Sequence, residues 1–342
     1  MLYDILFILG YLMMDVKISS TGIYLPKNIV HTKDLLDRFG VVDPNIEKHS
    51  GVYQRHVASE QLEETTSKMA AWAIVDALER ANISKTDLDL ILFASAAFEQ
   101  PVPDTAVLVQ KHLGISSHGT PCFSIHATCL GFLQALDVAA AFINSKRYTC
   151  IAIVCSEISS KAINPHDPSS YVLFGDAAAA AIVTPAQNTD TSKILHSYMT
   201  TFGEAAHYTE IIAGGTRKHP NHHTCTQEEH SFSMKGKEIL KFTLPKSSYI
   251  LDRIWPNLQY NTDDFVQIIT HQPSRIGLLA FQKFFPKEKT ISTLHKYGNC
   301  VSASLPLTLH EAICLNRLQR GDQTLLFGMG AGVSIGGMVI RY

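Results

Sequence analysis

Short apolar runs alternate with stretches of helical spacing along most of the chain. The run at 88–95 is apolar, bounded by polar residues and typical of a buried parallel strand. Upstream of it, Thr65 offers a capping hydroxyl, and apolar residues from Met69 to Ala77 follow at helical spacing. The nearly uncharged stretch 130–144 predicts a buried helix. Other elements expected in this half are a helix at 105–112 and strands at 123–128 and 148–156.

The second half of the chain repeats this order of elements. We expect helices at 235–251, 275–285 and 311–320, and strands at 265–270 and 323–327, the last leading into a glycine-rich turn. Alternation of β and α elements in both halves predicts an α/β fold with largely parallel sheets. The polar, irregular stretch 184–232 is interpreted as the junction between an N-terminal half at 15–185 and a C-terminal half at 186–342.

Composition supports a large globular core. The chain has 342 residues, of which 46% are hydrophobic and 18% charged, so intrinsic disorder and coiled coil are excluded. This length favours two domains or one duplicated domain. The formal net charge of −2 gives no overall reason to expect a nucleic-acid partner.

The first residues, 1–14, are an uncertain N-terminal extension. The segment is mostly apolar, but Asp4 interrupts it and no Lys or Arg precedes it. It is too short for a membrane span and lacks the basic region of a signal peptide, so we expect no membrane association. A start at Met13 or Met14 is one interpretation, and a short ordered extension or a segment resting on a partner is the other.

Seven cysteines are spread along the chain without any CxxC pair. This spacing argues against a disulfide framework and against a clustered zinc site, and it favours reduced thiols in the cytoplasm. His219, His222, His223 and Cys225 lie close together in sequence, but their Pro, Asn and Thr neighbours favour a solvated loop. No metal is expected.

Three residues could carry chemistry. Cys129 lies at a strand-to-helix junction, where the helix dipole would lower the pKa of its thiol. His271 follows an apolar strand, at the kind of strand end where ligands collect, and Asn299 lies in a Gly-Asn turn. The segment 327–332 can offer backbone N–H groups to an oxyanion. Each residue also has a purely structural interpretation, and Cys, His and Asn are equally the residue types of papain-like hydrolases.

Eight segments, taken in order, carry a resemblance to a known family. They are Thr21-Gly-Ile-Tyr-Leu-Pro26, Ser50-Gly-Val-Tyr-Gln-Arg55, Ala127-Thr-Cys-Leu-Gly-Phe132, Leu173-Phe-Gly-Asp-Ala-Ala-Ala179, Met234-Lys-Gly-Lys237, His271-Gln272, Tyr297-Gly-Asn299 and the glycine loop 327–332. Through them the chain, from about Val16 to Tyr342, resembles the β-ketoacyl-acyl-carrier-protein synthase III family of the thiolase-like superfamily.

The resemblance implies a thiolase-like duplicated αβαβα layered fold, a homodimer, and an acyltransferase without a cofactor. Cys129 matches the acylated nucleophile, and His271 and Asn299 match the pair that supports decarboxylation. The backbone N–H groups of Cys129 and Gly330 match the oxyanion hole. The implied partners are an acyl thioester, on an acyl-carrier protein or CoA, and malonyl-acyl-carrier protein. The implied reaction is a decarboxylating Claisen-type condensation that gives a β-ketoacyl thioester.

Some positions depart from the family pattern. Asn45 and His49 occupy places where family members commonly clamp the CoA adenine with Trp and Arg, so a carrier protein could supply the acyl group. Val102, before Pro103, replaces an aromatic residue that often shortens the acyl tunnel, which predicts a medium or long acyl donor. Arg275 is expected to bind the substrate carrier, together with Lys283, Lys287 and Lys289.

Two further polar residues near the predicted site receive structural interpretations. Glu99 is expected to be a surface or loop charge, and His126 a hydrogen-bonded histidine of the core or an interface. Two other functions remain open. One is a specialised acyltransferase, or a ketosynthase that joins two acyl chains in secondary metabolism. The other is a thioester hydrolase or an inactive interaction protein.

Overall fold

Two β-sheets form the framework of the protein. The computed structural model describes residues 13–40, 43, 45–164, 166–187 and 189–342. The first sheet has the strand order β1 (Val16–Tyr24), β7 (Ala177–Pro185), β6 (Ile151–Glu157), β4 (Leu90–Phe93) and β5 (Cys122–Ser124). The second has the order β11 (Gln267–Thr270), β12 (Gln323–Gly330), β13 (Ser334–Arg341) and β8 (Lys193–Thr201).

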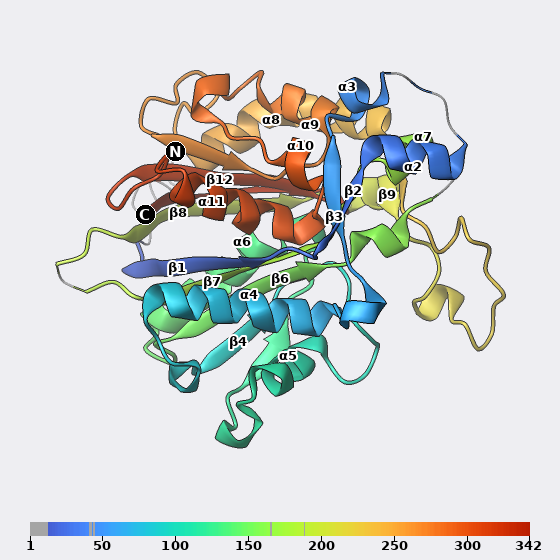
Figure 1. The fold of residues 1–342 in the computed structure, drawn as a ribbon. Coiled ribbons are helices and arrows are strands. Elements are labelled where there is room, and N and C mark those ends of the chain that lie inside the picture. The colour runs from blue at the N-terminus through green and yellow to red at the C-terminus, as the bar shows by residue number, and fades with distance from the viewer. Residues whose placement is uncertain (1–12, 41–42, 44, 165, 188) are drawn as a thin grey trace.

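Helices cover and separate these sheets, as Figure 1 shows. Helices α6 (Gly131–Asn144) and α11 (Ser304–Cys314) lie between the sheets and share one apolar core with both of them. Helices α4 (Thr66–Ala81) and α5 (Thr105–Leu113) pack on the outer face of the first sheet. Helices α8 (Gly236–Ile254) and α9 (Arg275–Phe281) pack on the outer face of the second. The α/β layered fold expected from the sequence is therefore confirmed. The expectation of largely parallel sheets is wrong, because β1, β7, β13 and β8 pair antiparallel with their neighbours and only β4, β5 and β6, and β11 with β12, pair in parallel.

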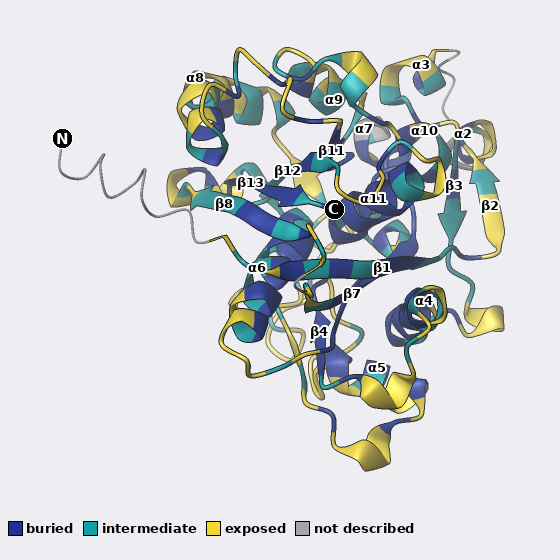
Figure 2. Cartoon of the chain, turned by 90° about the vertical axis from the view of Figure 1, so that its left-hand side faces the viewer, coloured by how far each residue is buried: buried dark blue, intermediate teal, exposed yellow. Residues whose placement is uncertain are grey.

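The remaining elements are short, and most lie beside these layers. They are β2 (Asn28–His31), β3 (Gln54–Val57), β9 (Thr209–Glu210), β10 (Ser233–Met234), α2 (Thr32–Phe39), α3 (Ile46–Ser50), α7 (Pro168–Tyr171) and α10 (Leu294–Tyr297). Figure 2 shows buried positions concentrated in the sheets and in the helices between them. No helix within the described residues is both long and apolar enough to cross a membrane.

The structure corrects three expectations about individual elements. The stretch 184–232 is not irregular throughout, because 193–201 forms strand β8, paired with β13. The predicted helix at 311–320 instead spans 304–314, since Pro306 lies in its first turn, where a helix tolerates proline. The strand predicted at 123–128 ends at Ser124.

The predicted N-terminal extension lies largely outside the described residues, which begin at Met13. Met14 already belongs to the fold, since its backbone exchanges two hydrogen bonds with Ile194, each 3.0 Å long. Its side chain packs against the core shared by the two sheets.

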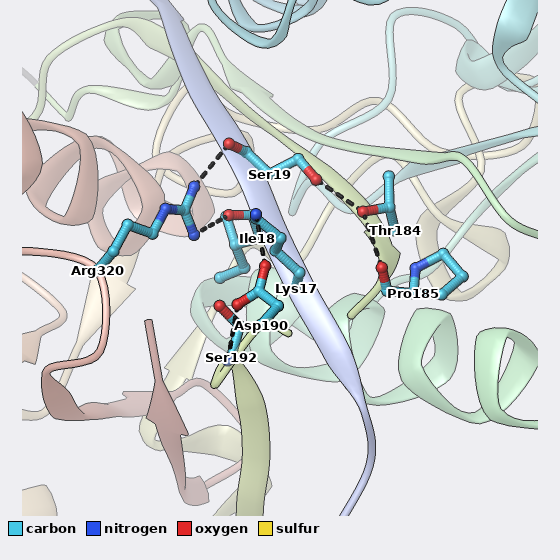
Figure 3. A network of polar contacts seen from close by, with 8 residues as sticks. All are labelled: Lys17, Ile18, Ser19, Thr184, Pro185, Asp190, Ser192 and Arg320. Carbon is cyan, nitrogen blue, oxygen red and sulfur yellow. Dashed lines mark hydrogen bonds and ion pairs between the residues drawn. The ribbon is translucent and has the colours of Figure 1, made fainter. Parts of the chain in front are cut away.

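Arg320 joins the two halves of the chain at one end of the layers, shown in Figure 3. Its guanidinium donates hydrogen bonds to the carbonyl oxygens of Ile18 and Ser19 in β1, at 2.8 and 2.7 Å. It also lies over the ring of Tyr342, 3.9 Å from the centroid. Arg320 precedes β12, so this joint lies at the strand end opposite Gly330.

We expect Arg320→Ala to lower the free energy of unfolding by about 1–2 kcal/mol, because it removes two charge-assisted hydrogen bonds at a partly exposed position. Urea unfolding measures the change. Substitution of the exposed Lys241 on α8 by Ala is the control and should leave stability within about 0.5 kcal/mol. Equal stabilities of the Arg320 and Lys241 variants would contradict this role.

Candidate active site

A strained turn presents Cys129 at the start of α6. The turn η4 (Thr128–Leu130) joins β5 to this helix, and Thr128 has a φ of 47°, a left-handed conformation that β-branched residues rarely adopt. Gly131 follows, and a Cβ there would lie 2.2 Å from the carbonyl oxygen of Ala94. Only glycine therefore lets α6 begin against the end of β4.

Burial dominates the electrostatics of Cys129. The backbone N–H groups of Cys129 and Ala331 donate hydrogen bonds to the sulfur, which favours the thiolate. Two effects outweigh these hydrogen bonds and raise the pKa of the thiol to about 12. The larger effect is burial, and the smaller is the negative charge of the nearby Glu157 carboxyl group. The N–H at the start of the helix therefore acts in the expected direction, but the net pKa is raised rather than lowered, although the side chain retains partial exposure.

His271 is a neutral, buried imidazole next to this turn. It follows β11, and its backbone N–H donates to the carbonyl oxygen of Phe327 in β12, at 2.9 Å. The residue is 2% exposed, and burial lowers its pKa to about 3. Its Nδ1 has no hydrogen-bond partner among the described residues. A neutral ring can offer one N–H to a bound substrate.

The side chain of Asn299 is held in a turn, and one of its two amide protons is available to a substrate. Its backbone N–H donates to the carbonyl oxygen of Leu173, at 2.8 Å. Its Oδ1 accepts from the N–H of Val301 at 2.8 Å, and its Nδ2 donates to the carbonyl oxygen of Pro273 at 3.0 Å. Because Nδ2 carries two protons, one remains for a substrate.

Two glycines at the end of β12 bring these groups together. A Cβ on Gly328 would lie 2.9 Å from Leu130 and 3.4 Å from the Cβ of His271. A Cβ on Gly330 would lie 2.8 Å from the hydroxyl of Thr128. The turn η4 also contacts the turn η9 (Val301–Ala303), which follows Asn299. Cys129, His271, Asn299 and Gly330 therefore converge where the two halves of the chain meet.

The two predicted substrate-binding residues lie on the surface. Val102 is 81% exposed and lies in the connection between β4 and α5. Arg275 begins α9 and donates a hydrogen bond to the carbonyl oxygen of Lys48, in α3. Asn45 directly precedes the same short helix and His49 lies in its last turn, so Arg275 belongs to one surface region with them.

The other two polar candidates have simple structural contacts. The carboxylate of Glu99 accepts a hydrogen bond from the N–H of Ser67, in the first turn of α4, at 2.8 Å. His126 is exposed, with its Nε2 2.9 Å from the carbonyl oxygen of Ala96. It is therefore not a core histidine, and its place in an interface stays a prediction.

The described residues include two groups near the site that the sequence patterns did not single out, the carboxyl group of Glu157 and the hydroxyl of Ser302. The backbone N–H of Ala331, which also faces the sulfur of Cys129, lies within the predicted segment 327–332. A signal existed for Glu157, because it ends the apolar run 151–155 and its strand is buried throughout. A carboxyl group in that position needs an explanation.

Comparison with known proteins identifies the family. Residues 123–203 match the model of 3-oxoacyl-[acyl-carrier-protein] synthase III, and residues 257–342 match that of its C-terminal part. The chain is 34% identical over 331 residues to β-ketoacyl-[acyl-carrier-protein] synthase III of Aquifex aeolicus, covering 96% of this chain and all of that protein.

Solved structures agree with this assignment. The crystal structure of the Aquifex aeolicus enzyme has a TM-score of 0.82 at 33% identity, covering 96% of this chain and 100% of that one. The enzyme of Pseudomonas aeruginosa shares the fold, with a TM-score of 0.84 at 24% identity over 96% of this chain and 98% of that one. The chain belongs to the β-ketoacyl-[acyl-carrier-protein] synthase III family, and it is an acyltransferase.

Proposed function

We propose that this enzyme condenses an acyl group bound to Cys129 with a malonyl thioester, with loss of CO2. The observation that carries the proposal is the convergence of Cys129, His271 and Asn299 around the glycines of β12. These residues supply a nucleophile and two neutral N–H donors. That set suits a reaction in which negative charge develops on thioester oxygens.

The first half-reaction acylates Cys129. The thiol loses its proton, the sulfur attacks the carbonyl carbon of the acyl thioester, and the tetrahedral oxyanion accepts hydrogen bonds from the N–H groups of Cys129 and Gly330. The carrier thiolate then leaves and takes up the proton. Because burial raises the pKa of Cys129, the proton must depart as the donor binds, while the N–H of Ala331 supports the developing thiolate.

The second half-reaction forms the new carbon–carbon bond. The malonyl thioester loses CO2, and the electron pair of the broken bond forms an enolate. Its oxygen accepts hydrogen bonds from the neutral His271 ring and from the free Nδ2 proton of Asn299. The enolate carbon attacks the acyl carbonyl, and the Cys129 thiolate is released. No base is needed, because CO2 leaves in place of a proton.

We infer that a carrier protein rather than CoA delivers the acyl group. Asn45 directly precedes α3 and His49 lies in its last turn, at positions where an adenine clamp would need an aromatic ring and a guanidinium. Arg275 and the exposed Lys283 and Lys287 lie on or just after α9, with Lys289 close behind, and offer cations to an acidic carrier.

We propose a cytoplasmic homodimer in which Val102 reaches the acyl tunnel of the partner subunit. Val102 and Phe98 are 81% and 60% exposed, and β5 is an edge strand of the first sheet. An edge strand beside exposed apolar side chains favours pairing with a second copy. All seven cysteines are free thiols, in keeping with a reducing compartment.

Cys129→Ala should abolish condensation, with a loss of at least about a thousandfold, because no covalent intermediate can form. Mass spectrometry of products from an acyl thioester and malonyl-carrier protein measures this. Substitution of the buried Cys155 by Ala is the control and should retain condensation. Retained condensation in the Cys129 variant, or free fatty acid as the only wild-type product, would overturn the proposal.

Val102→Phe should narrow the acyl range. We expect the rate of Cys129 acylation by dodecanoyl thioester to fall about tenfold, because the aromatic ring fills tunnel space, while acetyl thioester reacts at the wild-type rate. Val107→Phe, at an exposed position of α5, is the control. A wild-type enzyme that accepts only acetyl groups would contradict the tunnel assignment.

Substitution of His271 should make the free energy of unfolding depend less on pH below pH 6.5. Burial lowers the pKa of His271 to about 3, so below pH 6.5 the unfolded chain binds a proton that the folded chain does not. The free energy of unfolding therefore falls with pH below 6.5, with a limiting slope of about 1.4 kcal/mol per pH unit from this group. Urea unfolding at pH 7, 6 and 5 should show a smaller fall for His271→Asn, and parallel profiles would refute this.

A further inference from the structure

A buried carboxyl group lies at the seam between the two halves. Glu157 is the last residue of β6 and is 2% exposed. Its Oε1 accepts hydrogen bonds from the N–H of Ala96, at 2.6 Å, and from the hydroxyl of Ser302. The N–H groups of Ala97 and Ser302 also face it. Among the described residues its partners are all neutral donors.

Ser302 is the counterpart of Cys129 in the C-terminal half. Both follow a β-branched residue with a φ of 47°, Thr128 in one turn and Val301 in the other. Both turns lead directly into a helix of the layer between the sheets, α6 after η4 and α11 after η9. The duplicated fold thus places a strained turn on each side of the seam.

The turn at Val301 determines where Asn299 points. A left-handed β-branched residue costs of order 1–3 kcal/mol and persists only where its surroundings hold it. One support is the hydrogen bond from the N–H of Val301 to Oδ1 of Asn299, so the backbone at Val301 and the orientation of the amide are tied together. The other is the hydrogen bond from Ser302 to Glu157.

The same bond fixes the distance between the two turns. The Cβ of Ser302 lies 3.6 Å from the position that a Cβ on Gly131 would occupy, so Ser302 packs on the first residue of α6. Glu157 in turn is bonded to the segment Ala96–Ala97, which follows the Ala94 carbonyl that Gly131 contacts. Glu157 therefore links η9, the β4–α5 connection and the start of α6.

We propose that Glu157 is a positioning residue for the decarboxylating half-reaction, holding Ser302 and thereby directing the free amide proton of Asn299 toward the enolate oxygen that forms from the malonyl thioester. This inference rests on the proposed function. A carboxylate suits the task because it only accepts hydrogen bonds, whereas the NH2 of a glutamine would face other donors.

The buried charge of Glu157 is unfavourable in itself and disfavours the thiolate of Cys129. We infer from this that the carboxyl group serves a purpose other than activating the nucleophile. Burial raises the pKa of Glu157 to about 7 in spite of its four donors. Its charge also raises the pKa values of the Cys129, Cys155 and Cys300 thiols. The charge of Glu157 therefore does not activate Cys129 as a nucleophile.

Separate assays of the two half-reactions test the proposal. Acylation of Cys129 by S-octanoyl-N-acetylcysteamine is followed by intact-protein mass spectrometry, and decarboxylation of malonyl-carrier protein by CO2 release. We expect Glu157→Ala and Ser302→Ala to slow CO2 release about tenfold or more, with acylation within about threefold of wild type. The double variant should be no slower than Glu157→Ala, because both act through one hydrogen bond.

Ser156→Ala is the matched control. Ser156 precedes Glu157 on β6, and its buried hydroxyl donates to the carbonyl oxygen of Thr66, on α4, at 2.7 Å. This variant loses a hydrogen bond of the same strand away from Ser302, so its two half-reactions should stay at comparable fractions of wild type. Glu157→Gln, which keeps one acceptor oxygen, should recover part of the CO2 release lost in Glu157→Ala.

The outcomes separate this inference from the proposed function. A wild-type enzyme that releases no CO2 from malonyl-carrier protein refutes the proposed function itself. If the wild type is active, the positioning role is refuted when the Glu157 and Ser302 variants slow acylation as much as CO2 release. A larger loss of acylation than of CO2 release refutes it as well. Should Glu157→Ala fail to fold, Glu157→Gln and Ser302→Ala decide by the same criterion.

Discussion

Close approach of backbone segments at the seam between the two halves is the constraint on which the site depends. At Gly131, Gly328 and Gly330 a Cβ would lie within 2.2–2.9 Å of a neighbouring atom. At Gly131 the neighbour is the backbone of Ala94, so this position requires glycine if α6 is to begin against β4. At Gly328 and Gly330 the neighbours are the side chains of Leu130 and Thr128, which would have to shift to admit a Cβ, so glycine there lets the end of β12 lie close to η4 and His271.

Burial then sets the charge state of the site. The same packing that brings Cys129 and His271 together removes both from water, which keeps the thiol protonated and the imidazole neutral. A neutral imidazole suits a donor to an enolate oxygen better than a proton acceptor. The protonated thiol makes acylation dependent on groups that act once the donor is bound, among them the N–H of Ala331.

The duplication of the fold extends to the strained turns. Thr128 and Val301 adopt the same left-handed φ, one before the nucleophile and one after Asn299. The N-terminal turn presents a reactive sulfur, whereas in the C-terminal turn the equivalent hydroxyl of Ser302 bonds to Glu157. The same left-handed turn therefore presents the nucleophile Cys129 in the N-terminal half and positions the hydrogen-bond donor Asn299 in the C-terminal half.

Periodicity alone determined the alternating elements, and ordered motifs singled out Cys129, His271 and Asn299, because these signals are local. Periodicity misplaced α11, which spans 304–314 with Pro306 in its first turn rather than 311–320. Only the tertiary structure decided the pKa of Cys129, the exposure of Val102 and the partners of Glu157. Each depends on neighbours far apart in sequence, such as Ser302 beside Glu157, and no local pattern encodes that distance.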